Sequence, residues 1–129
     1  MPLPVTSLYA GLLALMCIIL SGMVGQLRGN AKVSLGDGGN RDLVVANRRH
    51  MNFVENVPLA LLLIALVELN GASKTWVHVL GAVLLIARII HPFGLSMDKM
   101  MMPARIAGAA ATIIVLLAAA ITLLWQVAR

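Results

Sequence analysis

Two long stretches of this chain contain no charged side chain. One covers residues 1–27 and the other covers residues 106–128. A helix needs about 20 consecutive apolar residues to cross the hydrocarbon of a bilayer, and both stretches are long enough. Hydrophobic residues make up 60% of the chain and the mean hydropathy is +0.95, values that lie outside the range of soluble domains. The sequence therefore predicts an integral membrane protein with a spanning helix towards each end.

Turn-forming and capping residues divide the chain into four helical segments. Residues 37–40 (DGGN) tolerate positive φ angles and predict a loop. Asn70-Gly71 predicts a helix end, Ser73 can cap the following helix, and Pro103 suits a first helical turn. The expected helices cover residues 4–27, 42–69, 74–92 and 103–127. No domain boundary is visible, so we expect residues 1–129 to form one all-α, four-helix bundle in the membrane.

The positive charges predict the orientation of these helices. Eight of the ten Lys and Arg residues lie in or beside two connections: Arg28, Lys32, Arg41, Arg48, Arg49, Arg88, Lys99 and Arg105. Cytoplasmic connections carry an excess of basic residues, so we expect the 28–48 and 92–104 loops to be cytoplasmic and both termini to lie outside. In a bacterium this would be a multi-pass protein of the inner (plasma) membrane. Topology and contact with membrane lipid account for the basic charge, and we expect no nucleic-acid partner.

The N-terminal stretch and the few potential metal ligands narrow the function classes. The stretch lacks a basic n-region and is longer than the core of a signal peptide, so we expect it to remain as a helix. Cys17 lies within it and is the only cysteine, which excludes a disulfide within the chain. Three separated histidines and one cysteine do not have metal-ligand spacing, so we expect no metal site.

Ionisable and polar residues interrupt the second expected helix. Arg48, Asn52 and Glu55 are spaced i, i+4 and i+7, which places them along one face over about two turns. Pro58 cannot donate a hydrogen bond to the carbonyl of Val54, so a kink is expected beside Glu55. This face could bind one elongated polar ligand.

The third expected helix carries a positive charge, Arg88, at the same depth as Glu55 on the second. Counted from the short turn at residues 70–73, Glu55 and Arg88 both lie about 21 Å below the outer surface. Charges inside a membrane usually have partners, so we expect Glu55 and Arg88 to pair. The alternative to a ligand site is a structural network of these polar groups that fixes the register of the helices.

Short motifs of polar residues lie on, or at the ends of, all four expected helices. The second carries the pattern Arg48-x-His50-x-Asn52-x-x-Glu55-x-x-Pro58. The other fragments, in chain order, are Gly25-Gln26-x-Arg28, Arg88-x-x-His91 and Pro103-x-Arg105. Together they resemble the MAPEG family, the membrane-associated proteins in eicosanoid and glutathione metabolism. The loop Gly36-Asp37-Gly38-Gly39 and the turn Glu68-Leu69-Asn70-Gly71 are most similar to those of its small bacterial members.

The resemblance implies a homotrimer that binds glutathione, as a co-substrate, in clefts between neighbouring subunits near the cytoplasmic side. It implies that Glu55 holds the α-ammonium of glutathione and that Arg48 and Asn52 bind other polar parts of the tripeptide. Arg28 would meet a carboxylate. The rest of the polar wall would come from His50, Asn56, Arg88 and His91.

The resemblance also assigns Arg105 to catalysis, as the cation that stabilises the glutathione thiolate. A thiol with a pKa of about 8.5 is mostly protonated at neutral pH, and a nearby cation lowers that pKa. A guanidinium stays charged, so it acts as an electrophilic stabiliser and not as a base. The implied activity is a glutathione S-transferase or peroxidase that acts on a small lipophilic electrophile from the bilayer.

Several alternatives remain open from the sequence. Many catalytic members have tyrosines where this chain has Asn56 and Leu95, so a glutathione-binding trimer without turnover is the second reading. A small multidrug-type transporter is the third, although such proteins usually carry their acidic residue in the first helix. His50 could instead face lipid headgroups, and His91 could instead make a structural hydrogen bond.

Overall fold

The chain folds as a bundle of four long helices. A computed structural model describes residues 2–99 and 102–129, so part of the expected 92–104 loop lies outside the described residues. The helices are α1 (Pro4–Ala31), α2 (Arg41–Leu69), α3 (Lys74–Ile90) and α4 (Pro103–Val127), and a short 3-10 helix, η1 (His91–Gly94), follows α3. The described residues contain no strand. The expected all-α four-helix architecture is confirmed.

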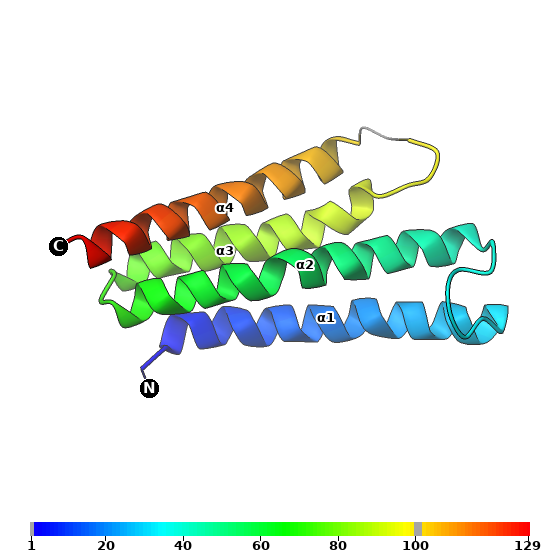
Figure 1. Cartoon of the computed structure of the whole chain (residues 1–129), viewed down its shortest axis with the longest axis horizontal. Coiled ribbons are helices and arrows are strands. Elements are labelled where there is room, and N and C mark those ends of the chain that lie inside the picture. Colours follow the sequence, from blue (N-terminus) through cyan, green and yellow to red (C-terminus); the bar gives the residue numbers. More distant parts are fainter. Residues whose placement is uncertain (1, 100–101) are drawn as a thin grey trace.

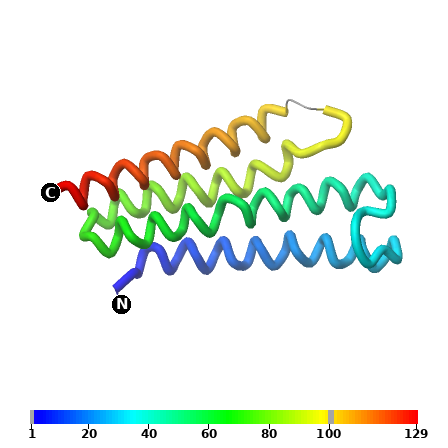
Figure 2. Tube along the Cα trace, in the orientation of Figure 1, coloured from blue at the N-terminus to red at the C-terminus, as the bar shows by residue number. Residues whose placement is uncertain are grey.

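The helices run antiparallel to their neighbours in sequence, along the long axis of the molecule (Figure 1). Each of the four is long and apolar enough to cross a membrane. Figure 2 shows both termini and the α2–α3 turn at one end of the bundle, and the α1–α2 and η1–α4 connections at the other. We call these the outer end and the inner end, after the orientation that the basic residues of the connections predict.

Two helices end at different residues from those expected. The first continues through Arg28 to Ala31 instead of stopping at residue 27. Polar residues mark where the chain leaves the apolar layer, but a helix can continue into water until a cap ends it. Here Lys32 adopts a left-handed conformation (φ 54°), and its N–H donates to the carbonyl of Gly29. The third α-helix ends at Ile90 and tightens into η1, because Pro92 has no N–H to donate.

The core is formed by an apolar stripe from each helix. Fully or nearly fully buried members include Leu13 of α1, Ile64 of α2, Leu84 of α3 and Val115 of α4. Other large apolar side chains of the same helices face outward and are exposed in the single chain. That distribution suits a protein surrounded by lipid, where the outer surface is as apolar as the core.

Polar side chains join the helices at the outer end. The Glu68 carboxylate of α2 accepts hydrogen bonds from the backbone N–H groups of Val5 (3.0 Å) and Thr6 (2.8 Å) and from the Thr6 hydroxyl (2.6 Å). It therefore caps the N-terminus of α1 from a neighbouring helix. At the end of α4, Gln126 donates to the carbonyl of Val67 at 3.1 Å. These contacts fix the relative heights of α1, α2 and α4.

Candidate functional site

Of the residues that the structure describes, Arg88 is the most deeply buried charged residue, with 2% of its surface exposed. Nη1 donates to the Asn52 side-chain oxygen on α2 at 2.9 Å. Nη2 donates to two acceptors on α4, the Gly108 carbonyl at 3.1 Å and the Thr112 hydroxyl at 2.6 Å. Arg88 thus joins α2, α3 and α4, and these three hydrogen bonds compensate part of the cost of burying its charge.

The expected pairing of Glu55 with Arg88 is wrong in this chain. The Glu55 carboxylate instead lies 3.6 Å from Nη1 of Arg48, and the two side chains are 47% and 58% exposed. The buried stripe of α2 passes through Phe53 and Val57, each two positions from Glu55. Two residues rotate a helix by about 200°, so Glu55 faces away from the interior of the bundle. Equal depth in the membrane carries no information about this rotation.

Arg48 and Arg105 line a common cavity at the inner end, of about 140 Å³. Arg48 comes from α2 and Arg105 from the first turn of α4, while the loop segment 95–97 forms another wall. Just before this loop, the close approach between the end of η1 and α4 depends on Gly94, where a Cβ would collide with the backbone of Arg105. We call this space the Arg48–Arg105 cavity.

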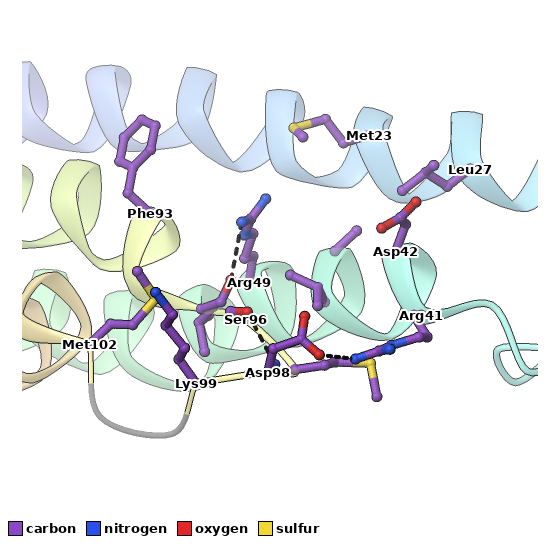
Figure 3. Close-up of a pocket in the computed structure, with 14 residues that line it drawn as sticks. Met23, Leu27, Arg41, Asp42, Arg49, Phe93, Ser96, Asp98, Lys99 and Met102 are labelled. Carbon is purple, nitrogen blue, oxygen red and sulfur yellow. Dashed lines mark hydrogen bonds and ion pairs between the residues drawn. The ribbon is translucent and has the colours of Figure 1, made fainter.

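A larger cavity, of about 560 Å³, lies beside it and is drawn in Figure 3. Its lining comes from α1, α2 and the segment that follows α3, and includes the same loop residues 95–97, so this loop segment borders both cavities. Arg49 donates from Nη2 to the carbonyl of Leu95 at 3.2 Å, and Arg41 forms an ion pair with Asp98. Two arginines of α2 thereby hold the loop. We call this space the loop cavity.

The sequence pattern does not mark Arg41 or Arg49 as site residues, because nothing in their spacing separates them from charges that meet lipid headgroups. Arg49 directly follows Arg48, and one residue along a helix is a rotation of about 100°. The two adjacent arginines consequently line different cavities.

Three other expected site residues lie close to the Arg88 network or on the same stretch of α2. His91 is buried in η1, and a Cβ on Gly108 would lie 2.7 Å from the His91 Cβ. Asn52 is a direct partner of Arg88. Asn56 donates from Nδ2 to the backbone carbonyl of Asn52 at 2.8 Å, which occupies its amide within the helix.

Two expected site residues lie elsewhere in the single chain. Arg28 donates from Nη1 to the Gly36 carbonyl at 2.8 Å and from Nη2 to the Asn47 side-chain oxygen at 3.4 Å, so it organises the α1–α2 loop. His50 lines a third cavity, together with Cys17 and Ser21 of α1. Neither residue lines the Arg48–Arg105 cavity.

Comparison with known sequences gives a match across almost the whole chain. A sequence model of the MAPEG family matches residues 6–125. The chain belongs to the MAPEG family. It is also similar to the inner membrane protein YecN of Escherichia coli strain K12 and to YecN of strain O6:H1, with 43% identity to each over 90 residues, which cover 70% of this chain and 69% of each relative.

Family membership confirms the resemblance carried by the motifs of the four helices. It places the chain among the membrane proteins of glutathione and eicosanoid metabolism. The name of the relatives describes a location and no reaction.

Proposed function

We propose that this MAPEG protein is a glutathione-dependent transferase of the bacterial inner membrane. The observation that carries the proposal is the Arg48–Arg105 cavity, where two cations from different helices face one space. Two guanidinium groups beside one cavity favour an anionic ligand. Family membership suggests glutathione as that ligand, and the name of the YecN relatives suggests the membrane.

The charges around the cavity match the ionised groups of glutathione, which carries one ammonium and two carboxylates. Glu55 would bind the α-ammonium, and Arg48, already 3.6 Å from Glu55, would bind the neighbouring α-carboxylate. Asn52 is bonded to the buried Arg88, so in this proposal both residues act indirectly, by holding α2 against α3 and α4. The sulfur would then lie near Arg105.

We further propose that neighbouring copies complete the site in a homotrimer. The Arg48–Arg105 cavity of about 140 Å³ is smaller than the pockets of roughly 300–1,000 Å³ that enclose small ligands. Arg48 and Glu55 also face outward on a spanning helix, and charges directed at lipid are costly. A second copy packed on this face would cover the ion pair and enlarge the cavity. Arg28, held in its own loop, could then contribute to the site of the neighbour.

The proposed reaction needs the two substrates, this polar site and water as the proton acceptor. The thiol proton of glutathione passes to water, and the thiolate stays beside the Arg105 guanidinium. The sulfur then forms a bond to an electrophilic carbon of a lipophilic molecule from the bilayer, while the leaving group departs with the electron pair of the broken bond. About 2.7 kcal/mol of preferential stabilisation would lower the thiol pKa by two units.

Ultraviolet thiolate absorbance, recorded as glutathione is added to the purified oligomer, tests this proposal. We expect a signal near neutral pH that Arg105→Ala removes and Arg105→Lys partly keeps. Arg129→Ala is the control, because it removes a cation at the outer end. A thiolate signal that is equally large in Arg105→Ala would refute the role of Arg105. Cross-linking in mild detergent checks the trimer separately.

The second candidate is a glutathione-binding membrane protein without turnover. It is favoured by the residues at the two tyrosine positions of many catalytic relatives. Leu95 lines the Arg48–Arg105 cavity with an apolar side chain, and the Asn56 amide is bonded within α2. Saturable glutathione binding without conjugation of a broad electrophile panel would favour this candidate. The family match gives no support to the transporter alternative.

A further inference from the structure

The loop cavity has the size and place of a separate ligand site. Its volume of about 560 Å³ lies within the range of small-ligand pockets. It lies at the inner end, between apolar residues of α1 and the charged first turn of α2. The 95–97 loop lies between it and the proposed thiolate position. A ligand in the loop cavity would therefore occupy a different site from the proposed glutathione thiolate.

Both signs of charge line the loop cavity. Arg41 and Asp98 pair with each other. The other charged residues of the lining are Arg49, Lys99 and Asp42. Among the described residues, Arg49 makes a single hydrogen bond, to the Leu95 carbonyl, and neither Lys99 nor Asp42 has a side-chain partner. Two cations and one carboxylate thus remain available. This set fits a ligand with an anionic group and, beside it, an ammonium.

The remaining lining is apolar and continues towards the bilayer. Met23 extends from α1 towards the cavity, and Phe93 extends from η1 on the other side (Figure 3). Phe93 is 74% exposed, and Ile19, one turn before Met23 on α1, is also exposed. An acyl chain that leaves the cavity would find a continuous apolar surface along Met23 and Ile19.

We propose that the loop cavity binds the headgroup of phosphatidylethanolamine. Its phosphate lies against Arg49 and Lys99, its ammonium donates to the Asp42 carboxylate, and its acyl chains follow α1 past Met23. A guanidinium and an ammonium are good phosphate ligands. The carboxylate adds a preference for a headgroup with N–H donors, and the apolar rim favours a lipid over a soluble phosphate ester.

Native mass spectrometry of the full-length, delipidated protein tests the assignment with three lipids of identical chains. Phosphatidylethanolamine should bind about tenfold more tightly than phosphatidylcholine or phosphatidylglycerol. The methylated ammonium of phosphatidylcholine has no N–H donor, and phosphatidylglycerol has no ammonium. A tenfold difference in affinity corresponds to about one charge-assisted hydrogen bond. Asp42→Asn should remove the preference while retaining phosphate binding. Arg49→Gln should lower the affinity for all three lipids about tenfold.

Control variants show whether lipid binding depends on this cavity. Lys74→Gln removes a cation at the outer end and should leave all three affinities unchanged. Lys99→Gln alters an exposed side chain, so it tests phosphate binding even if Arg49→Gln fails to fold. Equal binding of the ethanolamine and choline lipids, or an unchanged preference in Asp42→Asn, would overturn the assignment. So would displacement of the lipid by glutathione, or by free phosphoethanolamine at equal concentration, because either would identify a soluble ligand.

Discussion

The hydrogen bond from Arg88 to Asn52 gives the sharpest test of how α2 is rotated. Arg88 is 2% exposed and donates to the Asn52 side-chain oxygen at 2.9 Å, while Glu55 faces outward and pairs with Arg48. A hydrogen bond to a charged group contributes about 1.5–3 kcal/mol in proteins, and double-mutant cycles between membrane helices average about 0.6 kcal/mol. We expect a coupling energy of about 1–2 kcal/mol between Arg88 and Asn52.

Two double-mutant cycles measure this coupling. The first combines Arg88→Met with Asn52→Ala, and the second combines Arg88→Met with Glu55→Ala. Unfolding in mixed micelles can be followed by the fluorescence of Trp76 and Trp125, both at the outer end and distant from the mutations. Asn52→Ala alone should be destabilising, because it leaves a donor of a buried guanidinium without its acceptor. In the Arg88→Met background the same change should cost much less.

The second cycle provides the refutation. Because Glu55 is not a partner of Arg88, these two changes should be additive within about 0.5 kcal/mol. Additivity for Asn52 together with a coupling above about 1 kcal/mol for Glu55 would show that Arg88 pairs with Glu55. The outward rotation of Glu55 on α2 would then be wrong, and the expectation from equal depth would be right.

Three further variants test the packing at other heights. Gly108→Ala should lower the melting temperature, with a cost of about 1–3 kcal/mol, because the added Cβ would lie 2.7 Å from the His91 Cβ and 2.8 Å from the Ala87 carbonyl oxygen. Glu68→Gln should cost about 1 kcal/mol in the same assay, since an amide replaces a carboxylate that accepts three hydrogen bonds at the start of α1. Arg41→Gln should change the melting temperature little, because Arg41 and Asp98 are 63% and 73% exposed and an exposed ion pair contributes less than about 1 kcal/mol. A large fall in melting temperature would show instead that this ion pair is a main source of stability.

Local sequence signals predict several boundaries of the helices correctly. Ser73 accepts a hydrogen bond from the Trp76 N–H at the start of α3, and Pro103 occupies the first turn of α4. Both signals act within a few residues, so tertiary contacts have little opportunity to override them. The end of α1 differs from its expected place because the change from apolar to polar residues marks the edge of the bilayer, which a helix can cross.

The candidate site is only partly predictable, because its partners come from different helices. Arg88 and Asn52 stand out because polar residues are rare in spanning segments. The two acceptors of Arg88 on α4 do not stand out in the same way. Thr112 is one polar residue in an apolar run, and the Gly108 carbonyl belongs to the backbone, so no side-chain pattern marks either as an acceptor. The loop cavity depends on the segment after α3 folding back on α2, a tertiary contact with no periodic signal.

Depth and rotation are specified by different information in a membrane helix. The rise of 1.5 Å per residue fixes the depth of each residue once one end is placed, so the sequence alone sets Glu55 and Arg88 at similar heights. Rotation in a soluble helix is given by the apolar stripe, but here lipid-facing and core-facing side chains are both apolar. The rotation of α2 is then set by its contacts with the other helices, which bury Phe53 and Val57. This packing directs Asn52 towards Arg88 and leaves the Arg48–Glu55 ion pair on the exposed face of α2. Contact between these charges and lipid is costly, which is the physical reason for proposing that a second copy covers them.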